Sequence, residues 1–132
     1  MVALRVLIVE DNPVIRDLFM LGVDRLEEQL HLTQEDFQVF QAEDGASAWE
    51  HIATKGVDLI VVDLYLPVLN GLELIKRVRD NPETAHTRIL AISASIQDAR
   101  DRSLIAGADL FLQKPLRLVD LLDSLKALLK LK

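Results

Sequence analysis

Short aliphatic runs alternate with amphipathic segments along almost the whole 132-residue chain. The aliphatic runs predict strands over residues 4–9, 37–42, 58–62, 88–93 and 109–112. The segments that follow them have the apolar spacing of helices, over residues 13–30, 45–54, 71–80, 96–106 and 117–130. Three of the strands are nearly all aliphatic, which is typical of parallel strands that are covered on both faces.

Residues at the segment boundaries agree with this assignment. Asn12 followed by Pro13 is typical of a helix start, because an Asn side chain caps the first turn and Pro fits the next position. Gly107 is typical of the position just beyond a helix end, and Asn81-Pro82 of a helix that has stopped.

This alternation predicts an α/β fold, a doubly wound parallel sheet of five strands with right-handed crossovers and five helices. Five strands favour the flavodoxin-like order 2-1-3-4-5, in which the loops after the first and third strands flank the point where the order reverses. With 132 residues and no repeat or linker, we expect one domain over residues 1–132.

The composition argues against several classes of protein. A formal charge of −6 disfavours a nucleic-acid surface, since binding to phosphates needs clustered Lys and Arg. The chain has no Cys, and therefore neither a disulfide nor a thiolate metal site. No apolar run approaches the ~20 residues that a membrane span needs. We expect a cytoplasmic protein without direct contact to nucleic acid or membrane.

Polar residues follow the strands at the point where four of them end. Glu10 and Asp11 follow the first strand, Asp63 follows the third, Ser93 ends the fourth and Lys114 follows the fifth. Because the carboxyl ends of parallel strands meet at one edge of a sheet, we expect these side chains to share a crevice. That crevice would hold three carboxylates, one hydroxyl and one ammonium.

This set of groups points to phosphoryl transfer. The loop after the first strand lacks the glycine-rich pattern of nucleotide-binding folds, and the adjacent carboxylates of Glu10 and Asp11 repel phosphate unless a cation intervenes. Mg2+ prefers oxygen ligands and keeps positions for a substrate phosphate. Lys114 and Ser93 would offset the charge of a phosphoryl group while a carboxylate attacks it. The sequence therefore predicts a magnesium-dependent site.

The same motifs resemble the receiver domain of bacterial two-component response regulators, of the CheY-like, single-domain kind, over essentially the whole chain. The resemblance rests on Glu10-Asp11, on residues 63–71, on Ser93-Ala94 and on Lys114-Pro115. It implies that Asp63 accepts a phosphoryl group from a phosphohistidine on a sensor histidine kinase. Such a domain catalyses its own phosphotransfer and dephosphorylation but turns over no external substrate, and in that sense it is not an enzyme.

The resemblance also implies roles for the neighbouring residues. Mg2+ would be held by Asp11, Asp63 and the backbone carbonyl of Tyr65, with Glu10 acting mainly through metal-bound water. Glu10 stands where Asp is more usual in the family. Tyr65 borders the path of attacking water in the family, and its bulk predicts slow loss of the phosphoryl group.

Another set of residues is implied to contact the phosphoryl group. The side chains of Lys114 and Ser93 would bind its oxygens, with help from the backbone amides of Leu64 and Ala94. The Lys114-Pro115 bond resembles the family's cis peptide.

The family also implies a switch. Phosphorylation would draw Ser93 inward, and Phe111 would then move toward the vacated space. The changing surface would be residues 96–130, which would meet a downstream effector or a phosphotransfer protein. The protein would be a monomer, or a weak homodimer through this same face. Because Phe111 lacks a hydroxyl, its inward state would be held by packing alone.

Two other functions compete with this interpretation. A magnesium-dependent phosphatase also uses an aspartyl nucleophile, but it usually carries that residue after the first strand, whereas Asp63 follows the third. A receiver that only binds partners, without phosphorylation, would not need Asp11, Asp63, Ser93 and Lys114 together. The sequence favours the phosphorylated receiver.

Overall fold

The computed structural model describes residues 4–31, 36–66, 68–94 and 98–130. Its five strands form one parallel sheet in the order β2-β1-β3-β4-β5. They are β1 (Leu4–Val9), β2 (Phe37–Ala42), β3 (Leu59–Asp63), β4 (Arg88–Ser93) and β5 (Leu110–Gln113). The predicted fold class and strand order are confirmed.

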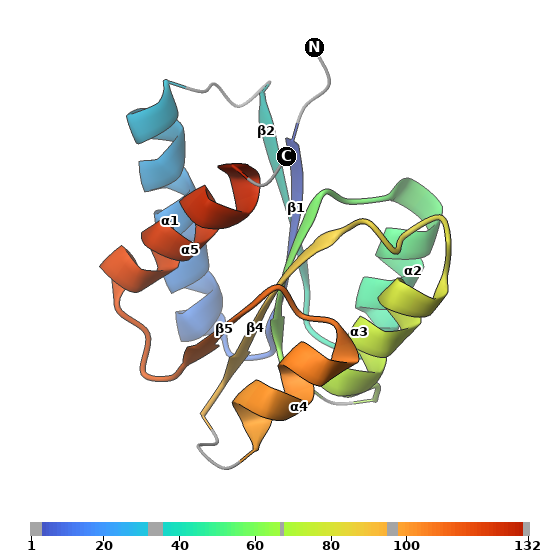
Figure 1. The fold of residues 1–132 in the computed structure, drawn as a ribbon. Coiled ribbons are helices and arrows are strands. Elements are labelled where there is room, and N and C mark those ends of the chain that lie inside the picture. The colour runs from blue at the N-terminus through green and yellow to red at the C-terminus, as the bar shows by residue number, and fades with distance from the viewer. Residues whose placement is uncertain (1–3, 32–35, 67, 95–97, 131–132) are drawn as a thin grey trace.

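The helices cover both faces of this sheet, with α1 and α5 on one side and α2, α3 and α4 on the other (Figure 1). They are α1 (Pro13–Leu30), α2 (Gly45–Lys55), α3 (Gly71–Asp80), α4 (Ala99–Ala106) and α5 (Leu118–Lys130). In the described ranges, no helix combines the length and the apolar character that crossing a membrane requires.

Side chains of the central strands alternate between two cores. In β1, Val6 and Ile8 join the cluster of Phe19 and Leu121 beneath α1 and α5, whereas Leu7 and Val9 join the cluster beneath the helices of the other face. This period of two explains why the central strands read as continuous aliphatic runs, since each successive side chain is buried on one face or the other.

Side chains cap three of the helix starts, including the predicted start at Asn12 and Pro13. The side-chain oxygen of Asn12 accepts a hydrogen bond from the amide of Val14, and Pro13 occupies the first turn of α1. Asp44 caps α2 and Asn70 caps α3 in the same manner. These caps satisfy amides that have no partner inside the helix, and they fix the loops at the carboxyl edge of the sheet.

The fourth helix begins later than the sequence pattern predicts. Helix α4 starts at Ala99, and Asp98 before it has a φ of 61°, a left-handed conformation that an α-helix cannot contain. The predicted start at residue 96 lies outside the described residues. Apolar spacing did not detect this boundary, because the backbone conformation of a single residue leaves the spacing unchanged.

Candidate functional site

Two carboxylates follow β1 and differ strongly in exposure. The side chain of Glu10 is fully buried, and its Oε2 accepts a hydrogen bond from the Asp11 amide at 3.0 Å. Asp11 is exposed at the mouth of the crevice. The backbone amide of Glu10 donates to the Ala42 carbonyl at 3.0 Å, so the end of β1 is held against β2.

Asp63 is the last residue of β3 and is only 4% exposed. Its Oδ1 accepts a hydrogen bond from the Tyr65 amide at 3.0 Å, and its Oδ2 accepts one from Lys114 Nζ at 2.8 Å. Gly71 lets α3 begin close to this strand, because a Cβ at that position would lie 2.4 Å from the Asp63 carbonyl oxygen. The carboxylate is therefore oriented from two sides.

Lys114 joins the ends of three strands. Its Nζ donates to Glu10 Oε1 and to Asp63 Oδ2, both at 2.8 Å, and its backbone amide donates to the Ser93 carbonyl at 2.8 Å. The following Lys114–Pro115 peptide bond is cis. The ammonium lies between two nearly inaccessible carboxylates and partly neutralises them.

The crowding of these charges changes two pKa values. Burial raises the pKa of Glu10 to about 7, and a hydrogen bond with Asp63 adds to the rise, while Lys114 opposes it. Burial disfavours the ammonium of Lys114, but the hydrogen bonds and charges of Asp63 and Glu10 outweigh that effect and raise its pKa. The crevice therefore favours positive charge and disfavours further negative charge.

The three acids have the geometry of a cation site. Glu10, Asp11 and Asp63 each offer a carboxylate oxygen, and these oxygens lie within 4.8 Å of one another. Such an all-oxygen donor set suits a hard divalent cation such as Mg2+, and the exposed Asp11 leaves the site open to solvent on one side. The residues present therefore fit the metal that the sequence predicts.

Ser93 and Phe111 lie on neighbouring strands. Ser93 ends β4 and is completely buried, and Ala94 after it is exposed. Phe111 pairs with Ala91 in the β4–β5 ladder and packs, half-buried, against the core cluster on the side of α2, α3 and α4. Phe111 therefore lies on the strand next to the one that Ser93 ends, and its part in a switch stays a prediction.

One amide predicted to contact a phosphoryl group already has a partner in the structure, and its contact with the phosphoryl group stays a prediction. The Leu64 amide, expected to contact a phosphoryl group, donates to the Ile92 carbonyl at 2.9 Å and so continues the pairing of β3 with β4. The Tyr65 amide, which already donates to Asp63 Oδ1, is the better placed donor. An Asp at the end of a strand is itself a sequence signal for this contact, because its carboxylate often accepts a hydrogen bond from the amide two residues on.

An ion pair that the sequence did not reveal joins two of the elements next to the site. Arg16 in the first turns of α1 lies 3.1 Å from Glu43, which follows β2. This pair joins the helix that begins beside Asp11 to the neighbouring loop. Charges 27 residues apart carry no signal of proximity in a single sequence.

Comparison with known proteins identifies the family. The family model described as the response regulator receiver domain matches residues 6–126. The transcriptional regulatory protein TrcR of Mycobacterium tuberculosis is 34% identical over 127 residues, covering 96% of this chain and 46% of TrcR. The sensor histidine kinase TmoS of Ectopseudomonas mendocina is 33% identical, over 97% of this chain and 12% of TmoS. The chain spans about half the length of the curated response regulators that it matches.

Solved structures agree with this assignment. A putative response regulator from Chloroflexus aurantiacus superposes with a TM-score of 0.85 at 27% identity, covering 97% of this chain and 98% of that chain. The receiver domain of the sensor histidine kinase PA1611 from Pseudomonas aeruginosa, which holds a magnesium ion in its active-site cleft, gives a TM-score of 0.81 at 26% identity, with 97% and 98% covered. The chain therefore belongs to the family of response regulator receiver domains.

Proposed function

We propose that Asp63 accepts a phosphoryl group from a phosphohistidine on a sensor histidine kinase. In this reaction a carboxylate oxygen of Asp63 forms a bond to phosphorus while the bond from phosphorus to the histidine nitrogen breaks. The nitrogen keeps the electron pair of that bond, and the product is an acyl phosphate. The observation that carries the proposal is the position of Asp63, buried at the end of β3 with Lys114 Nζ 2.8 Å from its Oδ2.

The residues around Asp63 support this reaction. The Lys114 ammonium would bind the phosphoryl oxygens and offset their charge. The Tyr65 amide and the Ser93 hydroxyl would donate hydrogen bonds to the same oxygens. The backbone amide of Ala94 would also donate a hydrogen bond to a phosphoryl oxygen. Glu10, Asp11, Asp63 and the Tyr65 carbonyl would hold Mg2+, which when bound offsets negative charge on the phosphoryl oxygens.

We further propose that the phosphorylated domain acts through a partner. Entry of the phosphoryl group would move Ser93, and Phe111 would repack beside it and alter the surface formed by residues 96–130. The partner would be a downstream effector or a phosphotransfer protein, reached by a monomer or by a weak dimer on that surface. Crystal structures with and without beryllofluoride would test the switch, and an unchanged Phe111 rotamer would contradict it.

Intact-mass measurement after incubation with acetyl phosphate and magnesium tests the phosphoacceptor. We expect the chain to gain the mass of one phosphoryl group and the Asp63→Asn variant to gain none. Asp17→Asn, which removes an exposed carboxylate on α1, is the matched control and should be labelled like the parent chain. Failure of the parent chain to be labelled would favour a receiver that works without phosphorylation. Turnover of p-nitrophenyl phosphate would instead favour a phosphatase.

Tyr65 should slow the loss of the phosphoryl group. Tyr65 is the second residue after Asp63, and it is 62% exposed. Its ring would therefore obstruct water that attacks the acyl phosphate. A Tyr65→Asn variant is expected to lose phosphate several-fold faster, because a short amide leaves room for water and helps to orient it. Release of inorganic phosphate from the phosphorylated chains measures the rate, and equal rates would remove the support for shielding.

A further inference from the structure

A small pocket lies beside the phosphoacceptor site, between the loop after β3 and helix α4. The described residues that line it are Leu64, Tyr65, Asn70, Leu72, Ala99 and Arg102. Leu64 and Tyr65 directly follow Asp63, so the pocket shares a wall with the site. Its lining includes neither the three acids nor Lys114. The pocket therefore adjoins the phosphoacceptor site through Leu64 and Tyr65, but its other lining residues have no part in the proposed phosphotransfer.

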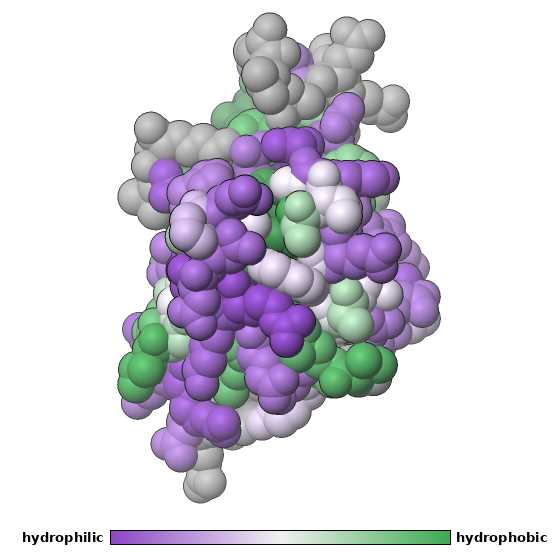
Figure 2. Space-filling model, turned by 90° about the vertical axis from the view of Figure 1, so that its right-hand side faces the viewer, coloured by the Kyte–Doolittle hydropathy of each residue, from purple (hydrophilic) through white to green (hydrophobic). Residues whose placement is uncertain are grey.

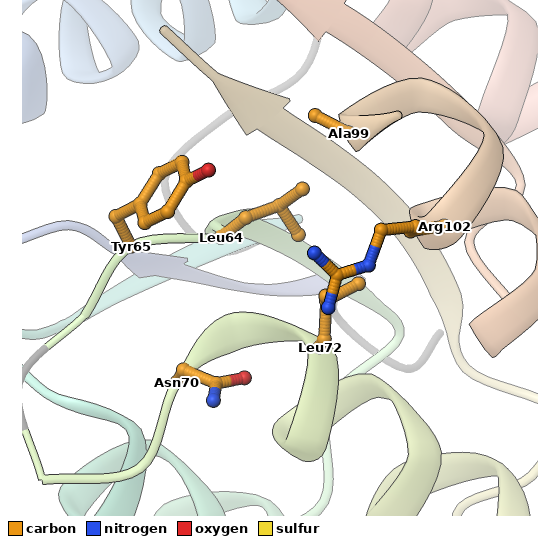
Figure 3. Close-up of a pocket in the computed structure, with 6 residues that line it drawn as sticks. All are labelled: Leu64, Tyr65, Asn70, Leu72, Ala99 and Arg102. Atoms are coloured by element: carbon orange, nitrogen blue, oxygen red, sulfur yellow. The ribbon is translucent and has the colours of Figure 1, made fainter. Parts of the chain in front are cut away.

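The pocket combines an apolar floor with a polar rim. Leu64 and Ala99 are buried and Leu72 is half-buried. Tyr65, Asn70 and Arg102 extend toward the same space from different sides (Figure 3). Figure 2 shows that hydrophobic residues on the side of α2 and α3 form small separate groups among hydrophilic ones. A broad apolar contact is thus not available there, and a partner would need a localised anchor.

Arg102 is the charged residue of this lining, and its guanidinium is exposed. Arg16, Arg79 and Arg117 each hold a carboxylate, at 3.1, 3.0 and 2.9 Å. Within the part of the chain that the structure describes, Arg102 has no such partner. The Asn70 side chain, in contrast, makes two hydrogen bonds with Glu73. Its Oδ1 accepts one from the backbone amide of Glu73 at 3.0 Å, and its Nδ2 donates one to the Glu73 carboxylate at 3.1 Å. Arg102 therefore makes the pocket complementary to an anion.

The volume of the pocket limits what can enter it. At about 130 Å³ it is smaller than the ~300–1,000 Å³ of typical small-molecule sites. A nucleotide or a drug-sized metabolite would not fit, whereas one apolar side chain of medium size would. A free inorganic anion is disfavoured because half of the lining is apolar.

We infer that this pocket anchors a segment of a partner protein in which a medium-sized apolar side chain lies next to a carboxylate. The apolar side chain packs on Leu64, Leu72 and Ala99, and the carboxylate pairs with the Arg102 guanidinium, which can donate two parallel hydrogen bonds. Buried anchors of this kind supply much of the affinity at protein interfaces. Ala99 and Arg102 belong to the surface of residues 96–130 that the proposed function assigns to a partner, but the inference goes beyond that function, since binding here requires no phosphoryl group.

Titration of the unphosphorylated, 15N-labelled full chain with a blocked dipeptide tests this inference by NMR. The probe is N-acetyl-Leu-Asp-amide, and N-acetyl-Leu-Asn-amide and N-acetyl-Gly-Asp-amide are its neutral and non-apolar controls. We expect saturable shifts of the amide signals of the lining residues, with about fivefold weaker binding of each control peptide. Equal binding of the three peptides, or shifts elsewhere only, would overturn the inference.

Two variants locate the binding groups. Arg102→Gln should weaken binding of the Leu-Asp probe about fivefold, whereas Arg100→Gln makes the same charge change on an exposed residue of the same helix, outside the lining, and should not. Ala99→Leu should fill the pocket and abolish binding, and its own spectrum shows whether it folds. If Arg102→Gln binds like the parent chain, the inference is wrong. Asp63→Asn should bind normally, which separates this test from that of the proposed function.

Discussion

Glu10 shows how one residue controls the charge of the site. It is fully buried, where solvent cannot stabilise its carboxylate, and its pKa rises to about 7. The hydrogen bond from Lys114 lowers the pKa of Glu10, but it does not fully offset the effect of burial. In the absence of metal, this side chain is therefore largely protonated below pH 7, and cation binding must displace the proton.

Magnesium affinity should consequently depend on pH. With the Glu10 pKa at about 7, we expect about tenfold weaker binding at pH 6 than at pH 8, measured by titration calorimetry. Glu10→Gln cannot lose a proton there, so its affinity should be lower and nearly constant over this range. A parent chain with the same affinity at both pH values would contradict the role given to Glu10.

Val68 carries backbone strain next to the site. Its φ is 70° and its side chain is 84% exposed, so packing does not compensate for a β-branched residue in the left-handed region. Val68→Asn should therefore raise the free energy of unfolding in urea by about 1 kcal/mol. Val119→Asn replaces a half-exposed valine within α5 and should not raise the free energy of unfolding. An unchanged or lowered stability of Val68→Asn would show that no strain is stored there.

At the scale of the elements, the packing of α2 on β2 involves a titratable group. The ring of His51 on α2 lies 4.6 Å from that of Phe40 on β2. Its buried Nε2 has no hydrogen-bond partner among the described residues. Burial lowers its pKa first, and the charges of Lys55 and Arg5 lower it further. Single-sequence patterns do not show which histidine faces a neighbouring strand.

This shift makes the contribution of His51 depend on pH. Because the folded state lowers the pKa of His51, the unfolded chain binds the proton more readily. The contribution of His51 to the free energy of unfolding is therefore present above pH 6.5 and is lost as the pH falls through the pKa of the folded state. His51→Gln should be less stable than the parent chain at pH 8, and the difference should shrink at pH 5 in urea unfolding. His86→Gln, at an exposed position, should show no such change. A constant difference for His51→Gln would contradict the account.

At the scale of the whole molecule, the parallel sheet followed from the alternation of apolar runs, since burial on both faces imposes that pattern on β1, β3 and β4. The strand order followed from the number of strands, because five strands favour the flavodoxin-like arrangement. The meeting of Glu10, Asp11, Asp63 and Lys114 followed from the same topology. The start of α4 could not be predicted from the sequence, because the backbone torsion of the single residue Asp98 determines it. The pocket lined by Arg102 could not be predicted from the sequence either, because it depends on how side chains of two different elements lie in space.

Locating the phosphoryl group on the chain tests most directly whether Asp63 is the phosphoacceptor. Borohydride reduces an aspartyl phosphate to homoserine, so the chain is incubated with acetyl phosphate and magnesium, reduced, digested and sequenced by mass spectrometry. We expect homoserine at position 63 and at no other aspartate. Homoserine at a different position, or an unmodified Asp63 in a chain that has gained a phosphoryl group, would contradict it.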